Sequence, residues 1–402
     1  MAISWADAEQ LYQHTQLISE NSSSAVWLGE CKLNHRPVCI KMVKKGSSTS
    51  SRLLTKIIRE ISLFKKMDHP LVAPLYLWYE NVESSCLVME HLGSGSVLDY
   101  VNTKGPVSES LGKRLFTQLV LVLDYLHNDL HIAHRDIKAE NIMLDSDHNI
   151  RIIDFGLSAE FSEKDPVLFS KCGSPAYVAP EVIMEKGYTK SADIWSAGIV
   201  LYALFCGRLP FDSANHGELN HRILNCEPEF PSHINAEVRY IIRRMLNKDP
   251  STRITSVELK DSAFFSRIEA EHINHIKSRF CDTNNITYRT DPHIINLISS
   301  YGLDPSSINQ CLFLREFDIP TSMYRLIRRE QMNHMLSDRS KVFETYPTVQ
   351  NKNSISKNAS ISKRPSIEAF LNHNTAKGPR SYNPTASYKD IRTHFRKPQV
   401  IE

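Results

Sequence analysis

The sequence lacks the features that mark secreted, membrane-spanning and metal-scaffolded proteins. No uninterrupted apolar run approaches the roughly 20 residues that span a bilayer. The first residues show no basic stretch followed by an apolar one, so no secretory signal is expected, and Ala2 excludes N-myristoylation, which needs glycine there. The eight cysteines include no Cys-x-x-Cys pair. We therefore expect reduced thiols, no zinc site and a cytoplasmic protein, with the nucleus as the alternative location.

The overall charge is also unremarkable in sign and size, because 402 residues carry a formal net charge of +3. Nothing in this balance calls for nucleic acid or a membrane surface as a partner. The chain is 41% hydrophobic, which is enough for a sizeable core. Its length predicts two or three structural units.

The order of secondary-structure patterns indicates an α+β protein with a cleft between two lobes. Strand patterns occupy residues 25–28, 38–43 and 85–90, around a helix predicted over 53–66 with Ile57, Ile58, Ile61 and Phe64 on one stripe. From about residue 108 the patterns are mainly helical. A small strand-rich lobe thus precedes a larger helical lobe, and clefts between such lobes favour ligand sites.

The last quarter of the chain divides into a helical segment and a basic tail. Three short helical patterns lie at 294–298, 308–313 and 323–327. Residues 336–402 contain twelve Lys and Arg against five Asp and Glu, with no sustained apolar period. This composition predicts a mostly disordered tail, either a plain linker or a regulatory arm.

The run His134-Arg135-Asp136-Ile137-Lys138-Ala139-Glu140-Asn141 contains the groups that phosphoryl transfer to a hydroxyl requires. Asp136 can orient the hydroxyl and accept its proton, Lys138 can offset phosphate charge, and Asn141 can bind Mg²⁺.

Two further segments add to that chemistry. Asp154-Phe155-Gly156 follows an apolar strand and suits a Mg²⁺ ligand that reaches phosphates. Lys41 lies within the apolar strand 38–43, and a buried lysine is costly unless it is paired. Glu60, on the helix that follows, is its expected partner.

These motifs, in this order, resemble the protein kinase family over about 250 residues. Ala179-Pro180-Glu181 and the Asp193-Ile-Trp-Ser-Ala-Gly run match two more of its motifs, and Cys39 replaces the usual alanine before Lys41. The resemblance implies the bilobal protein-kinase fold, with ATP and Mg²⁺ as cofactors and proteins as substrates. Its catalytic residues would be Lys41, Glu60, Asp136 and Lys138, and its metal ligands Asn141 and Asp154. Its ATP-binding positions would be Ser19, Asn21, Ser24, Val26, Cys39, Lys41, Met89, Glu90, Leu92 and Met143. Its structural positions would be Arg135, Phe155, Gly156, Glu181, Asp193 and Arg253, and His134, Phe155 and Phe64 would form part of the regulatory spine.

Lys138 and the Cys172-Gly-Ser-Pro-Ala-Tyr-Val-Ala-Pro-Glu run resemble serine/threonine kinases of the calmodulin-dependent group, especially relatives of the AMP-activated and microtubule-affinity-regulating kinases. The resemblance implies an activation loop with Ser170 and Ser174, in which Ser170 would be phosphorylated by an upstream kinase. Residues 290–332 resemble a ubiquitin-associated-like domain, with a generic helical extension as the alternative. The expected boundaries are 1–14 (N-terminal extension), 15–267 (kinase domain), 268–289 (linker), 290–332 (helical domain) and 333–402 (tail).

The phosphate-covering loop departs from the family pattern. Ser19, Asn21 and Ser24 occupy its three glycine positions, where backbone N–H groups must approach phosphate closely. This predicts weakened ATP affinity and supports one alternative, a weakly active pseudokinase that acts as a scaffold. A small-molecule kinase is a third hypothesis, which the peptide-positioning stretch 173–181 disfavours. Ser96 and Ala203 replace acidic residues of arginine-directed relatives, so only Glu140 could favour a basic substrate.

Overall fold

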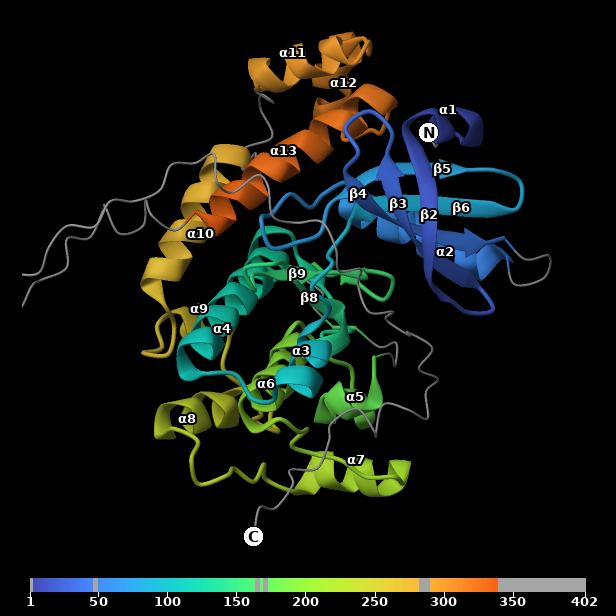
Figure 1. Ribbon diagram of the computed structural model, residues 1–402. Coiled ribbons are helices and arrows are strands. Elements are labelled where there is room, and N and C mark those ends of the chain that lie inside the picture. Colours follow the sequence, from blue (N-terminus) through green and yellow to red (C-terminus); the bar gives the residue numbers. More distant parts are fainter. Residues whose placement is uncertain (1–2, 46–49, 163–166, 169–172, 282–289, 339–402) are drawn as a thin grey trace, which may run out of the picture.

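The computed structural model describes residues 3–45, 50–162, 167–168, 173–281 and 290–338. A small strand-rich lobe lies beside a larger helical lobe, and a further group of helices runs along one side of both (Figure 1). The predicted bilobal α+β fold is confirmed. Within the described ranges, no helix has the length and apolar character needed to cross a membrane.

The small lobe is built on a six-stranded sheet with the order β1-β5-β6-β4-β3-β2. The five strands β2 to β6 are antiparallel, while β1 pairs in parallel with β5 at the sheet edge. The strands are β1 (Ile3–Ser4), β2 (Tyr12–Glu20), β3 (Ser24–Cys31), β4 (Pro37–Lys44), β5 (Leu75–Glu80) and β6 (Ser84–Glu90). The three predicted strands are therefore present, and each is longer than expected, most of all β3.

The described part of the N-terminal segment belongs to this lobe and is not a separate extension ending at residue 14. Helix α1 (Trp5–Leu11) follows β1, and β2 begins at Tyr12. The segment is folded because Ala8, Leu11 and Tyr12 are buried against the sheet and the C-terminal helices.

Helix α2 (Ser50–Phe64) matches the predicted helix, with one correction to its apolar stripe. Ile57, Ile61 and Phe64 are buried, but Ile58 is 59% exposed. One residue advances a helix by about 100°, so Ile58 lies off the face that its neighbour buries.

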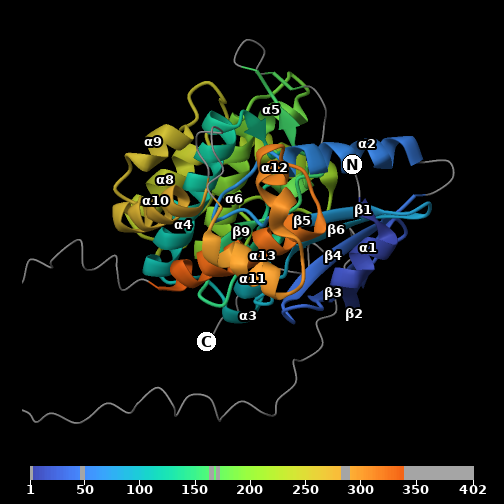
Figure 2. The same cartoon turned by 90° about the horizontal axis from the view of Figure 1, so that it is seen from above.

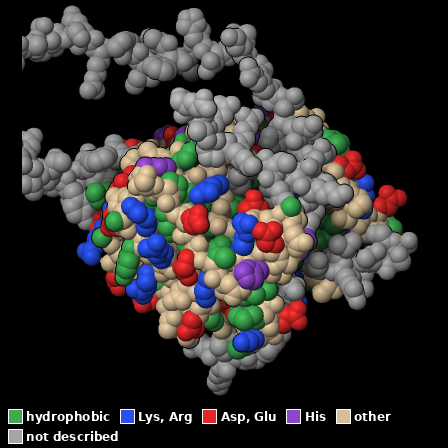
Figure 3. Space-filling model, turned by 90° about the horizontal axis from the view of Figure 1, so that it is seen from below, with side chains coloured by type: hydrophobic (Ala, Val, Ile, Leu, Met, Phe, Trp, Pro, Cys, Tyr) green, Lys and Arg blue, Asp and Glu red, His purple; other side chains and the backbone are tan. Residues whose placement is uncertain are grey.

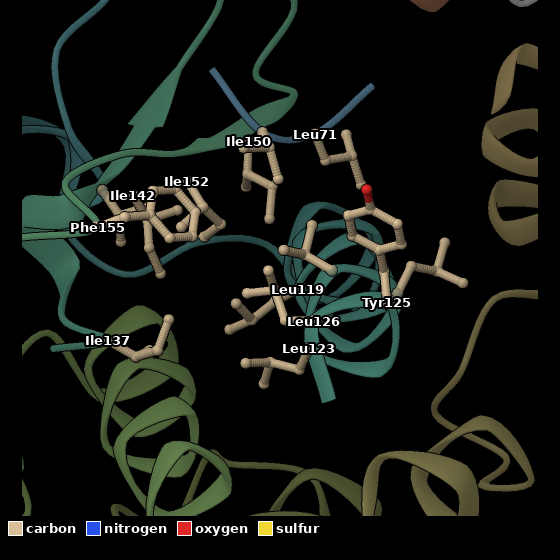
Figure 4. Packing of buried hydrophobic residues seen from close by; sticks show 14 of the residues in the cluster. Leu71, Leu119, Leu123, Tyr125, Leu126, Ile137, Ile142, Ile150, Ile152 and Phe155 are labelled. Carbon is tan, nitrogen blue, oxygen red and sulfur yellow. The ribbon is translucent and has the colours of Figure 1, made fainter. Parts of the chain in front are cut away.

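The large lobe packs around two long helices, α4 (Glu109–Asp124) and α6 (Ser191–Cys206). Leu119, Leu123 and Leu126 face the apolar side chains of β8 (Ile142–Leu144) and β9 (Ile150–Ile152) (Figure 4). Surrounding these are α3 (Val97–Lys104), η1 (Tyr125–Asp129), β7 (Ile132–Ala133), η2 (Ala139–Asn141), β8 (Ile142–Leu144), β9 (Ile150–Ile152), β10 (Ala159–Glu160), η3 (Pro175–Tyr177), α5 (Pro180–Ile183), α7 (His216–Asn225), α8 (Ala236–Met245) and α9 (Ser256–Lys260). On the face seen in Figure 3, acidic and basic side chains are interspersed.

Helix α10 (Arg267–Phe280) occupies most of the segment predicted as a linker. It forms because Ser266 caps its first turn and Ile273 and Ile276 are buried. The prediction of a linker over 268–280 was therefore wrong.

The three helical patterns beyond the linker form α11 (Pro292–Ser300), α12 (Ile308–Phe313, preceded by the turn η4, Pro305–Ser307) and α13 (Ile319–Ser337). Helix α13 extends five residues past the expected boundary at 332. It contacts α10, β5 and α1, so it touches both lobes (Figures 1 and 2). The assignment of a ubiquitin-associated-like domain stays a prediction.

Candidate active site

The carboxylate of Asp136 lies at the centre of a compact polar cluster. It accepts from Lys138 Nζ at 2.8 Å, from Asn141 Nδ2 at 2.9 Å and from Ser174 Oγ at 3.2 Å. Lys138 Nζ also donates to Ser174 Oγ at 3.0 Å. The cluster thus brings a buried carboxylate, a cation and a hydroxyl together within hydrogen-bonding distance.

The loop carrying Asp136 is held by a buried carboxylate on α6. Asp193 accepts from the backbone N–H groups of His134 and Arg135, both at 2.8 Å, and pairs with His127 Nε2 at 2.9 Å. Burial alone would raise the pKa of Asp193, but these donors outweigh it and hold the pKa below its ordinary value. Arg135 has a φ of +68°, so the loop adopts a conformation that a non-glycine residue keeps only under such restraint.

A second charged cluster lies on the small-lobe side of the cleft. Lys41 Nζ is 3.2 Å from Glu60 Oε1 and 3.5 Å from Asp154 Oδ1, so the predicted pairing with Glu60 is present. Burial opposes the charge on Lys41, yet the two carboxylates overcome it and raise the pKa of Lys41. Lys41 in turn lowers the pKa of Asp154. Asp154 also accepts from Gly156 N at 3.3 Å, which fixes the start of the predicted metal-binding turn.

Three rings join the two clusters. Phe155 packs against Phe64 of α2 with ring centroids 5.4 Å apart and against His134 with centroids 4.8 Å apart. The three side chains predicted to share a spine are thus in contact. The stack places α2, and with it Glu60, in register with the catalytic loop.

A buried ion pair anchors the segment after the activation loop. Arg253 donates to both carboxylate oxygens of Glu181, at 2.6 and 2.8 Å. Ser170 lies outside the described residues.

Comparison with known proteins decides the family. The protein kinase domain family matches residues 12–265. This chain belongs to the serine/threonine protein kinases.

The kinase is similar to plant and animal members of one branch. It is 33% identical to CBL-interacting serine/threonine-protein kinase 8 of Arabidopsis thaliana, over 81% of this chain and 77% of that one. It is 34% identical to the SNF1-related protein kinase catalytic subunit alpha KIN12 of the same plant, over 72% and 58%. With mouse serine/threonine-protein kinase SIK1 the identity is 36%, over 62% and 32%. For the last two, the match spans less than two thirds of the relative's length.

The phosphate-covering loop of this kinase is closed by one of its own side chains. Asn21 Oδ1 accepts from the backbone N–H of Ser23 at 2.9 Å and of Ser24 at 2.8 Å. The same oxygen contacts the hydroxyls of both serines, at 3.1 and 3.2 Å. Two N–H groups of the loop are therefore already bonded. Ser19, the remaining position, lies in the strand ladder opposite Val26.

The other predicted nucleotide positions line adjacent strands. Val26 lies opposite Lys41, Cys39 lies opposite Met89, and Met143 forms a bridge with Ser96. Leu92 is the second residue after β6. The arrangement is consistent with a nucleotide site between β3, β4 and the chain that links the lobes.

The side chain of Glu90 makes a buried contact with α13 that sequence reasoning missed. Its backbone ends β6 as expected, but its buried side chain accepts from Arg329 Nη2 at 2.8 Å and Asn333 Nδ2 at 2.7 Å of α13. Arg151 Nε lies 3.6 Å away. The available signal was a carboxylate inside the apolar stretch 86–90, which needs a cationic partner somewhere in the chain.

Proposed function

We propose that this kinase transfers the γ-phosphoryl group of Mg·ATP to serine and threonine hydroxyls of protein substrates. The observation that supports this most is the Asp136 cluster, in which one carboxylate meets a lysine, an amide and a hydroxyl. Asp136 would orient the substrate hydroxyl and accept its proton, while Lys138 would offset charge on the transferred group. Lys41, held by Glu60, would contact the α- and β-phosphates.

The residues present suit Mg²⁺, which prefers oxygen ligands and keeps several waters. Asn141 donates its amide N–H₂ to Asp136, so its carbonyl oxygen remains for the metal. Asp154 is partly exposed, and the backbone N–H of its neighbour Ile153 donates to the backbone carbonyl of Asn141 at 3.0 Å, which keeps Asn141 and Asp154 adjacent. When bound, Mg²⁺ would neutralise phosphate charge.

We further propose control through the activation loop, with Ser170 phosphorylated by an upstream kinase. Arg135 supports this, because its Nε is buried with no hydrogen-bond partner among the described residues. A phosphate nearby would supply the missing acceptor. Mass spectrometry of the active protein, together with the activity of Ser170→Ala, tests this: full activity in the variant would show that Ser170 is no switch.

The substrate need not carry an upstream arginine. Ser96 uses its hydroxyl and backbone N–H in the capping box of α3, and Ala203 is buried. Burial raises the pKa of Glu140, which also contacts the Tyr177 hydroxyl. The remaining acid is thus poorly placed to attract a cation. Phosphorylation of a randomised peptide library by the purified full chain, read out by position, tests both the activity and this preference.

A pseudokinase scaffold is the second candidate. The observation that favours it is the Asn21 cap, by which we mean the bonds from the backbone N–H groups of Ser23 and Ser24 to Asn21 Oδ1. Nucleotide binding measured beside phosphate transfer separates the two. Transfer to the library supports the kinase, whereas no nucleotide binding at millimolar ATP would favour the scaffold.

A further inference from the structure

A cavity of about 450 Å³ lies behind the small lobe, away from the catalytic cluster. Its walls come from the end of α2 and the following turn, from η1 and the end of α10, and from α12 and α13. We call it the rear cavity. Its volume falls within the roughly 300–1,000 Å³ of ligand pockets. Neither Lys41, Asp136 nor Asp154 lines it, so it is distinct from the ATP cleft.

The lining of the rear cavity is strongly positive. Seven Lys and Arg side chains line it against two carboxylates, Asp68 and Asp129. From outside the lining, Glu90 pairs with Arg329 and Glu160 with Lys66. Asp68 in turn pairs with Arg328 and Asp129 with Lys277. Among the described residues, seven cations and four carboxylates thus lie in or beside the rear cavity.

Two of these cations lie over one ring, and a third is bonded to the backbone beside it. Lys65 Nζ lies 5.9 Å and the Arg325 guanidinium 4.4 Å from the centre of the Phe317 ring. Arg315 Nη1 donates to the backbone carbonyl of Lys65 at 3.2 Å, which ties the loop before α13 to the end of α2. The group therefore combines one cation from the catalytic domain with two from the C-terminal helices.

The inner wall of the rear cavity is apolar. Phe64, Leu75, Leu312 and Met332 are buried there. His69 lies among them, where burial and then the cations Lys277, Arg329 and Arg151 lower its pKa. It is therefore neutral at pH 7 and adds no charge. A cavity with cations at one side and apolar walls at the other fits an organic molecule that carries a phosphate group.

We propose that the rear cavity binds a phosphorylated small molecule, whose phosphate is held by Lys65, Arg315 and Arg325. Such a ligand would fasten α12 and α13 to the end of α2. Because Phe64 contacts both this cavity and Phe155, occupancy would stabilise the stack that aligns Glu60 with the catalytic loop. The proposal does not depend on the proposed activity.

Inorganic pyrophosphate is the probe, titrated calorimetrically into the full chain at constant ionic strength, which keeps screening fixed. Pyrophosphate can also bind in the ATP cleft. Lys41→Met removes the cation proposed to bind phosphate there, so the binding that this variant loses belongs to the ATP cleft. We expect two classes of site in the wild type, of which Lys41→Met removes one. The double variant Lys65→Gln/Arg325→Gln should weaken the other by about tenfold or more, the value of a lost charge-assisted hydrogen bond.

Lys113→Gln removes a cation that lies over a ring of the large lobe, Phe264, outside the rear cavity. It is the matched control and should bind like the wild type. If Arg325→Gln destabilises the C-terminal helices, the binding of pyrophosphate to the single variant Lys65→Gln tests the proposal. A single class of site that Lys41→Met abolishes would overturn the proposal, as would unchanged binding in Lys65→Gln. Phosphate transfer to peptides should persist in the Lys65 variant, so a failure here is distinguishable from a failure of the kinase assignment.

Discussion

At the scale of single residues, the carboxylate of Asp136 has three side-chain neighbours and can be altered without changing its size. Asp136→Asn keeps an acceptor oxygen but loses the base. We expect phosphate transfer to fall by about 10²–10⁴-fold, the usual contribution of a general base. A single-turnover assay measures it.

Nucleotide affinity serves as the control for that variant, because Asn141 and Asp154 remain in place. It should change little. Substantial transfer by Asp136→Asn would remove Asp136 from the role of base.

Asn21 offers a second residue-scale prediction. Asn21→Gly frees the N–H groups of Ser23 and Ser24 that the side chain now occupies. Backbone N–H groups that contact the phosphates stabilise bound ATP and the transition state about equally. The KM for ATP should therefore fall while kcat changes less. Steady-state kinetics over a range of ATP concentrations measures both, and Asn21→Gly/Ser24→Gly should extend the effect.

Ser22→Gly is the matched control, since it adds the same backbone freedom in the same turn but leaves the cap intact. An equal fall of KM in Ser22→Gly would show that flexibility, not the cap, limits binding. An unchanged KM in Asn21→Gly would mean that the serine hydroxyls already compensate for the missing glycines.

At the scale of elements, α13 holds the chain that links the lobes through a buried ion pair. The exposed fractions of the Arg329 and Glu90 side chains are 4% and 5%. Arg329→Met leaves Glu90 buried with a weaker set of partners, and removing one partner of a buried pair costs about 3–5 kcal/mol. We expect a loss near the lower end of that range in chemical denaturation, because Arg151 and Asn333 remain.

Glu330 is the next residue on α13 and provides the control. Its pair with Arg36 is exposed, so Glu330→Gln should cost no more than about 1 kcal/mol. Equal losses in the two variants would argue against a special role for the buried pair.

The pair of Glu90 and Arg329 also predicts how the stability of the folded protein depends on pH. Burial alone would raise the pKa of Glu90, but Arg329 and Arg151 outweigh it and hold the pKa below the ordinary 4.5. A lowered folded-state pKa contributes stability that is fully present above the ordinary value and is lost as the pH falls through the lowered one. Arg329→Met should therefore lose less stability than the wild type as the pH falls below the ordinary pKa of 4.5, measured by thermal unfolding.

At the scale of the whole molecule, the C-terminal helices are expected to stabilise both lobes together. Tyr12 of the small lobe bonds Ser322 at 2.7 Å, and Arg151 of the large lobe bonds Asn333 at 2.9 Å. A chain ending at Cys281 exposes the apolar surface that α13 covers, so its melting temperature should fall and its activity should change. A chain ending at residue 338 isolates the effect of the tail, and identical behaviour of all three chains would make the helices an independent appendage.

The sequence by itself determined the family, the two-lobed order of strands and helices, and the pairs that local chemistry demands. In His134–Asn141 and Asp154–Gly156 the reactive groups stand at short fixed spacings. The residue types in these two runs therefore indicate their chemistry without knowledge of the fold. Lys41 inside an apolar strand required a carboxylate, and Glu60 is the partner found.

Only the tertiary structure decided which distant surfaces meet. Glu90 and Arg329 are 239 residues apart, and several basic residues could have satisfied the buried carboxylate equally well on sequence grounds. The Asn21 cap depends on the rotation of one side chain in a tight turn, and α10 forms because α4 offers a surface that its apolar residues can cover. Partner choice of this kind follows from packing between remote segments, which neither periodicity nor motif spacing contains.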